Sequence, residues 1–205
     1  MPFYIDDIPA EPFVIEPPET IDLTLFTAAT AEIVAPDAVT MALVASIDEI
    51  TMTITVDQPA VSAFLVEGVH RLRIVVESAD ARRALPDVRL VVQDADSEWH
   101  TLDSIREEWA DAEVIPDPSL WELLELARGQ VLEFAPAVVD ADGNALPVPS
   151  RYRDGQRIHA RNIWNASKVS PDGGLGGDDF VIRPFPLDWH VKQILRPKHG
   201  IPVVA

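Results

Sequence analysis

Several residue types and patterns that would assign a biochemical class are missing from this sequence. Cysteine is absent, which excludes a disulfide scaffold, a thiolate metal site and a cysteine nucleophile. No window approaches about 18 uncharged apolar residues, so we expect no membrane span. Residues 1–10 carry two aspartates and no basic residue, and therefore lack the basic flank and apolar stretch of a secretory signal. Synthesis in the cytoplasm fits these absences.

The composition is that of a folded protein with a strong and uneven negative charge. Its 205 residues suffice for one large domain or two small ones, and an apolar fraction of 47% argues against disorder. The formal net charge is −18, with 29 acids and 7 bases in residues 1–150 but 5 acids and 9 bases in residues 151–205. Such a body is poor at binding DNA phosphate, which needs clustered cations. The acidic surface either keeps the protein soluble or faces DNA that must pass without binding.

The first half of the sequence predicts an extended arm followed by a β domain. Five prolines within residues 1–20 indicate irregular chain, because proline removes a backbone donor and restricts the residue before it. Between residues 21 and 97, apolar and polar residues alternate in short runs, as in half-buried strands. These runs span residues 21–26, 50–56, 69–76 and 88–92. Their spacing predicts an antiparallel β-sandwich of the immunoglobulin-like kind.

The second half, residues 98–205, changes to helical periodicity and predicts a small helical domain, which makes the whole chain α+β. Thr101 can cap a first helix. Asp117 at a cap position and Pro118 in the first turn predict a second helix, which ends before Pro136. The apolar face expected for this second helix consists of Leu120, Leu123, Leu124, Ala127, Val131 and Leu132.

Two further helices and a flexible loop are expected near the C-terminus. A third helix spans about residues 150–168, and Gly155 is a weak point within it. Residues 169–179 read as a flexible loop, residues 180–183 as a short strand and residues 187–195 as a last helix. The third helix has a basic side formed by Arg151, Arg153, Arg157 and Arg161.

Two segments have only a superficial likeness to ligand-binding motifs. The turn that begins at Asp140 is similar to a fragment of a calcium loop, but Ala145 stands where the EF-hand needs glycine and Arg151 where it needs glutamate. A plain turn is the better interpretation. The glycine-rich residues 173–177 lack the Lys-Ser/Thr of a phosphate-binding loop and precede two aspartates. We interpret them as a connector.

The titratable residues do not form a catalytic set. The five histidines are scattered, and none pairs with another at the three- or four-residue spacing of metal ligands. His159 and His190 are predicted to lie on helix surfaces or at an interface. No nucleophile, base and oxyanion site come together. We therefore predict no catalytic residue, no cofactor and no metal site, and a protein that is not an enzyme.

A cluster of aromatic, basic and polar residues near the C-terminus is the most distinctive feature of the sequence. It comprises Arg161, Asn162, Trp164, Asn165, Phe185, Asp188, Trp189, Lys192 and Arg196. Tryptophan and arginine are enriched at interface hot spots, because they combine a large buried area with directional donors. Trp164 and Trp189 could equally pack the helical core, and in a small domain both interpretations can hold.

Residues 161–167 (RNIWNAS) and 180–198 (FVIRPFPLDWHVKQILRPK), with the Gly/Asp loop between them, resemble the C-terminal signature of head-to-tail adaptor (connector) proteins from phages of actinobacteria. The likeness covers about residues 100–205, and the helix from Leu120 to Phe134 is similar to the central helix of these adaptors. The resemblance implies a small helical bundle with a long loop and no enzymatic activity. It also implies a homo-oligomeric ring, commonly of twelve copies, in the neck of the virion.

The resemblance further implies the partners of such a ring. They are the portal protein, under which the ring docks, and the next neck or tail protein, a stopper or terminator. Genomic DNA would pass through the channel without specific binding, and no membrane is involved. The β-rich front half departs from the helix-only adaptors and looks like the added sandwich domain of some phage neck proteins.

These interpretations give a set of expected interface residues. Contacts with the portal or a neighbouring subunit are expected at Arg161, Trp164, Phe185, Asp188, Trp189, Lys192, Arg196, Lys198, Ile201 and Val203. The tail, residues 196–205, is expected to contact the portal. The alternatives are a tail, baseplate or capsid-decorating binding module, or another neck ring. Phe64 is the only aromatic residue between residues 27 and 98, which counts against a sugar-binding platform.

Overall fold

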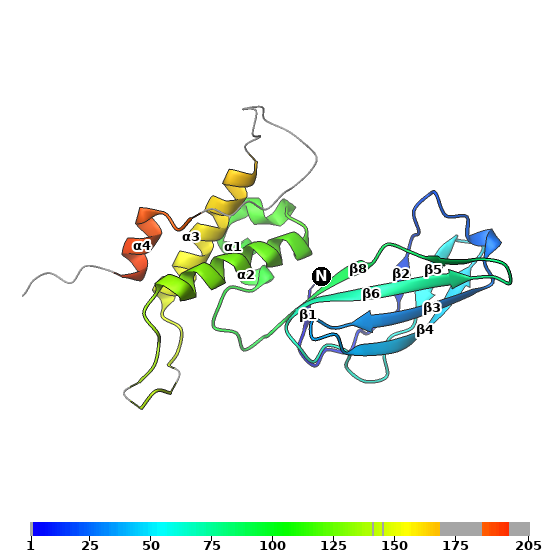
Figure 1. Cartoon of the computed structure of the whole chain (residues 1–205), viewed down its shortest axis with the longest axis horizontal. Helices are drawn as coiled ribbons and strands as arrows, with labels where there is room; N and C mark the ends of the chain where they lie inside the picture. Colours follow the sequence, from blue (N-terminus) through cyan, green and yellow to red (C-terminus); the bar gives the residue numbers. More distant parts are fainter. Residues whose placement is uncertain (1, 141, 145, 169–185, 197–205) are drawn as a thin grey trace, which may run out of the picture. The chain divides into compact units, whose positions relative to one another are not determined.

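The computed structural model describes residues 2–140, 142–144, 146–168 and 186–196. The chain divides into two compact units, residues 1–95 and residues 96–205 (Figure 1). All strands of the described chain lie in the first, the β unit, and its four α-helices lie in the second, the helical unit. The mixed α+β class expected from the sequence is therefore confirmed. The sequence had suggested a boundary between residues 97 and 98.

The strands of the β unit form one curled sheet. They are β1 (Phe3–Tyr4), β2 (Phe13–Ile15), β3 (Ala28–Val34), β4 (Thr40–Asp48), β5 (Thr53–Val56), β6 (Gly68–Glu77), β7 (Arg82–Ala84) and β8 (Val88–Gln93). Their order is β1-β8-β6-β3-β4-β5-β2, and β7 also pairs with β6. Only the β1–β8 pair is parallel among these strands. The described strands are not divided into two facing sheets, so a sandwich is not confirmed.

The curl of the sheet brings its two edges together. β1 and β2 stand at opposite ends of the strand order, yet the ring centroids of Phe3 and Phe13 are 6.0 Å apart. Phe3 also packs on Phe64 with a centroid distance of 4.6 Å. Residues 1–20, expected as an extended arm, thus supply both edge strands. These strands have two and three residues, and such short edges offer little backbone to a foreign strand.

The core of the β unit lies inside this curl. β6 alternates as the sequence predicts, with Leu72, Ile74 and Val76 fully buried and Arg71 and Arg73 on the outer face. The predicted strand over residues 69–76 is confirmed by β6, and that over residues 88–92 by β8. The inward residues of neighbouring strands and Phe64 complete one apolar cluster.

The expected strand over residues 21–26 is wrong. This segment contains the 3-10 helix η1 (Leu23–Leu25). The Asp22 carboxylate accepts hydrogen bonds from the backbone N–H of Thr24 at 3.0 Å and from its hydroxyl at 2.6 Å. The aspartate side chain thereby stabilises a turn, which competes with the backbone hydrogen bonds of a β-ladder. The alternation that predicted a strand instead places Leu23 in the core.

The run over residues 50–56 is only partly a strand. β5 covers Thr53–Val56, and the residues before it form a turn. The Asp48 carboxylate accepts hydrogen bonds from the backbone N–H groups of Ile50 at 2.9 Å and Thr51 at 3.2 Å. Ile50, expected on the buried face, is consequently 94% exposed.

The helical unit contains helices close to those predicted. They are α1 (Leu102–Glu108), the 3-10 helix η2 (Ala110–Val114), α2 (Asp117–Phe134), α3 (Ser150–Ser167) and α4 (Trp189–Leu195). Thr101 caps α1 by accepting a hydrogen bond from the Ser104 N–H at 3.2 Å. Pro116 occupies the cap of α2, so Asp117 is its first residue. The loop and strand expected over residues 169–183 lie outside the described residues.

The face of α2 that packs inward differs from the prediction at two positions. Trp121 is buried, whereas Leu132, expected in the core, is 52% exposed. At 100° per residue, Trp121 and Leu132 lie only about 20° apart, beyond Leu124 at one margin of the apolar stripe. At this margin the angle around the helix does not decide which of the two side chains is buried.

Gly155, the expected weak point of α3, is instead the place where α4 packs. A Cβ atom added to this residue would lie 2.9 Å from Cδ2 of Leu195 and 3.6 Å from Cγ2 of Val131. Leu195 and Val131 are both fully buried, and they share one apolar cluster with Tyr152 and Val191. The missing side chain of Gly155 thus lets α4 approach α3 closely.

Candidate interaction surface

The outer face of α4 carries three of the residues expected at an interface. Asp188 caps this helix, because one carboxylate oxygen accepts a hydrogen bond from the backbone N–H of Val191 at 2.8 Å. The other oxygen accepts a hydrogen bond from Asn162 of α3 at 2.6 Å. Since α4 turns Val191 and Leu195 into the core, Trp189, Lys192 and Arg196 share its opposite face at helical spacing. We call these three residues the α4 stripe.

The α4 stripe combines an exposed indole with two cations held over an aromatic ring. Trp189 is 72% exposed. The Nζ atom of Lys192 lies 5.8 Å from the ring centroid of Phe134, and the guanidinium carbon of Arg196 lies 4.5 Å from it. Cation–π contacts of this length stabilise by about 0.5–1 kcal/mol at exposed sites. They hold the positive charges at defined positions, which favours recognition of an acidic partner.

A groove lies beside the stripe, between α2 and α4. It has a volume of about 530 Å³ and is lined by Leu126, Gln130, Glu133, Phe134, Leu187 and Lys192. Leu126, Gln130 and Phe134 recur every four residues along α2 and form its floor. We call this hollow the α2–α4 groove. This groove was not predicted from the sequence, although the four-residue spacing of these residues on α2 was a readable signal.

The remaining predicted interface residues are divided between α3 and segments outside the described structure. Arg161 is exposed on α3, whereas Trp164 is half-buried there. Lys168 places its Nζ atom 4.7 Å from the Trp164 ring centroid. Phe185, Lys198, Ile201 and Val203 lie outside the described residues. Packing in the core therefore explains why Trp164 is half-buried, but it does not explain why Trp189 is left exposed on α4.

Two of the histidines are structural parts of the helical unit. His159, predicted at the surface, is fully buried, and its Nε2 atom lies 2.8 Å from Oε1 of Gln130 on α2. Burial lowers the pKa of His159, and burial likewise lowers the pKa of His100. The surface prediction for His159 is wrong because this side of α3 packs on α2, where the Gln130 side chain supplies a hydrogen-bond partner for the imidazole.

A buried glutamine joins the same elements. The Nε2 atom of Gln156 donates to the carbonyl oxygen of Leu124 at 3.1 Å, and its Oε1 atom accepts from the backbone N–H of His100 at 3.1 Å. These groups are closed off from solvent, so a substrate cannot reach them. The network fixes α2 and α3 for packing and does not form a catalytic site.

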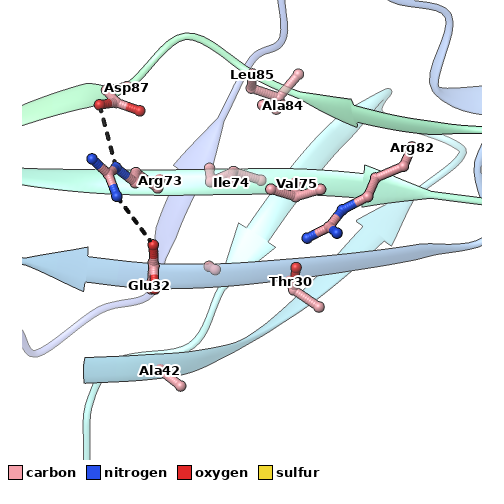
Figure 2. A pocket seen from close by; sticks show the side chains of 11 residues that line it. Thr30, Glu32, Ala42, Arg73, Ile74, Val75, Arg82, Ala84, Leu85 and Asp87 are labelled. Carbon is pink, nitrogen blue, oxygen red and sulfur yellow. Dashed lines mark hydrogen bonds and ion pairs between the residues drawn. The ribbon is translucent and has the colours of Figure 1, made fainter. Parts of the chain in front are cut away.

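The outer face of the β unit has a hollow of about 550 Å³ over β3, β6 and β7, shown in Figure 2. Arg73 lies 3.5 Å from Glu32 and 3.7 Å from Asp87. Figure 2 shows Arg73 between these two acids, while Arg82 extends from the neighbouring strand. The residues that line this hollow are aliphatic, polar or charged, and none is aromatic. This lining does not favour a sugar-binding platform.

The turn after Asp140 behaves as a plain turn. The Asp140 carboxylate accepts hydrogen bonds from the backbone N–H groups of Asp142 and Asn144, both at 2.9 Å. The side-chain hydrogen bond from Asn144 contributes most to lowering the pKa of Asp140. Among the described residues no three histidine or acidic side chains gather as a metal site would require.

Comparison with protein-family models and with curated proteins finds no match. Within the described ranges, no helix combines the length and apolar character needed to cross a membrane. The features that bear on function are therefore the α4 stripe, the α2–α4 groove and the residues that resemble phage adaptors.

Proposed function

We propose that this chain is a structural virion protein, a head-to-tail adaptor that forms an oligomeric ring under the portal and joins the capsid to the tail. The observation that carries the proposal is the α4 stripe beside an open groove. Trp189 exposes a large apolar ring, and the cations next to it are held in place on Phe134. A tryptophan in this setting is the residue type most enriched at protein interfaces.

The likeness to phage adaptors supports the same function. Its most specific part includes Asp188, Trp189, Lys192 and Arg196, which α4 brings onto one short element next to α3. In the proposal, the helical unit is the adaptor domain with a bundle fold, and the β unit is the added sandwich-like domain that stands outside the ring. The tail, residues 196–205, contacts the portal.

The charge distribution supports a channel through which DNA slides. The chain carries 34 acids and 16 bases, so a ring of many copies is strongly anionic. An inner wall lined by carboxylates repels the DNA backbone and keeps it from binding. A neutral or basic inner wall in the assembled ring would exclude this part of the proposal.

A mass measurement with the portal protein of the same phage tests the function. Purified chain and portal are mixed and the complex is analysed by native mass spectrometry. We expect a species that contains the portal ring and a ring of this chain, commonly of twelve copies. Deletion of residues 196–205 should abolish this complex while the circular dichroism of the chain stays unchanged. If the full-length chain never binds the portal, the proposed function is wrong.

A further inference from the structure

A small acidic projection stands at the start of α2. In η2, Asp111, Glu113 and Val114 point outward, and Val114 is 78% exposed. We call these three residues the acidic knob. An aliphatic side chain that is so exposed, close in sequence to two exposed carboxylates, is suited to enter an apolar hollow with a positive rim.

The acidic knob is held in a fixed conformation. Ala112 and Ile115 are buried on its inner side. Arg106 of α1 donates to the carbonyl oxygen of Ile115 at 3.1 Å and to the carboxylate of Asp117 at 2.6 Å. Because the knob is already ordered, little conformational entropy is lost when it binds.

The α2–α4 groove has the complementary chemistry. Its apolar floor and wall include Leu126, Phe134 and Leu187, and Lys192 stands at its margin. Arg196 adds a second cation over the Phe134 ring. Lys192 and Glu133 are the charged lining residues and balance each other, so the excess positive charge beside the groove comes from Arg196.

Knob and groove lie at opposite ends of the same helix. The knob directly precedes α2, and the groove is formed by its second half, from Leu126 onward. At about 1.5 Å per residue, the 18 residues of α2 span roughly 27 Å. The knob therefore cannot fill the groove of its own chain. Two knobs repel one another, which disfavours a contact in which one knob faces another.

We propose that the acidic knob of one copy docks into the α2–α4 groove of the next copy. This inference rests on the proposed ring and names the surfaces by which neighbouring copies contact each other. In this arrangement each copy gives its knob to one neighbour and its groove to another, and repetition of such a heterologous contact generates a closed ring or a filament. Val114 enters the apolar floor, while Asp111 and Glu113 face Lys192 and Arg196.

Cysteine crosslinking tests the contact. Because the chain has no cysteine of its own, each crosslink must join introduced cysteines. Val114→Cys and Glu133→Cys are made in separate full-length chains, which are treated with a short bismaleimide, alone and in equal mixture. We expect dimers of one chain of each kind in the mixture only. A chain with both substitutions should give a ladder of oligomers. Ile50→Cys, at a residue that is more exposed than Val114 but lies in the β unit, is the control and should give no dimer with either variant.

Charge reversal adds a second readout. Lys192→Glu combined with Arg196→Glu in the groove partner should reduce the crosslinked dimer at least about tenfold. Asp111→Lys combined with Glu113→Lys in the knob partner should then restore it. Restoration would not occur if the first pair of substitutions had only unfolded α4.

The outcomes separate this inference from the proposed function. Dimers of Val114→Cys with itself, dimers of Glu133→Cys with itself, or no dimer in the mixture would each overturn the inference. If ring-sized complexes with the portal form without the crosslink, the function stands and the contact is wrong. If the crosslink forms but the chain never binds the portal, the contact stands and the adaptor function is wrong.

Discussion

Gly155→Ala should destabilise the wild-type protein but stabilise a variant in which Leu195 is shortened to alanine. In the interior of a helix, alanine is more favourable than glycine by about 1 kcal/mol. In the wild type, however, the new methyl group would lie 2.9 Å from Cδ2 and 3.5 Å from Cγ of Leu195. Leu195 is fully buried, so it cannot move aside into solvent.

The magnitudes follow from this geometry. Overpacking of a buried site costs about 1–3 kcal/mol, so Gly155→Ala should lower the free energy of unfolding by up to about 2 kcal/mol in the wild type. Leu195→Ala alone leaves a cavity and should cost about 2–5 kcal/mol. In that background the close contact is gone, and Gly155→Ala should instead raise the free energy of unfolding by about 1 kcal/mol.

Urea unfolding followed by tryptophan fluorescence measures these effects. All five tryptophans lie in the helical unit, so the signal reports on that unit alone. Gly129→Ala in α2 is the matched control, because no atom lies within 4 Å of its added Cβ. It should stabilise by about 1 kcal/mol in both backgrounds. The reasoning is refuted if Gly155→Ala has the same effect, within about 0.5 kcal/mol, with and without Leu195.

Three further predictions concern pH, a helix cap and an ion pair. Burial lowers the pKa of His100 and His159, both in the helical unit, below the ordinary 6.5. Below about pH 6.5 the unfolded chain therefore binds more protons than the folded chain. The free energy of unfolding should fall as the pH drops through this range, by at most about 1.4 kcal/mol per pH unit for each histidine. Urea midpoints that are unchanged between pH 7.5 and 5.5 would contradict this prediction. Thr101→Ala removes the cap of α1 and should cost about 1 kcal/mol, while Thr101→Ser should be nearly neutral in the same assay. Asp117→Asn weakens the 2.6 Å contact with Arg106 and should cost about 1–2 kcal/mol, and an unchanged urea midpoint would show that this pair does not stabilise the start of α2.

The helices were predictable because local signals start and stop them. Thr101, Pro118 and Pro136 act through hydrogen bonds and backbone restrictions within one or two turns. The strand prediction failed where an aspartate side chain competed for the backbone, at Asp22 and Asp48. The curl of the sheet could not be predicted, because the pairing of β1 with β8 joins residues far apart in the sequence.

The candidate interaction surface was predictable only in part. Helical spacing places Trp189, Lys192 and Arg196 on one face, and that can be read from the sequence. The groove beside them requires α2 to pack next to α4, which depends on Gly155 and Leu195 meeting in space. Likewise, the exposure of Val114 follows from the burial of its neighbour Ile115, and a sequence pattern of five residues does not specify which of them faces inward.

The parallel pairing of β1 with β8 fixes the order in which the β unit can be completed. Phe3 stands beside Val92 in the ladder, so the first strand of the unit finds its neighbour only after almost the whole unit has been synthesised. Contacts between residues so distant slow folding, because a long loop must close before they form. Until then Phe3, Phe13 and Phe64 share no closed core, and apolar surface that is exposed during folding favours aggregation.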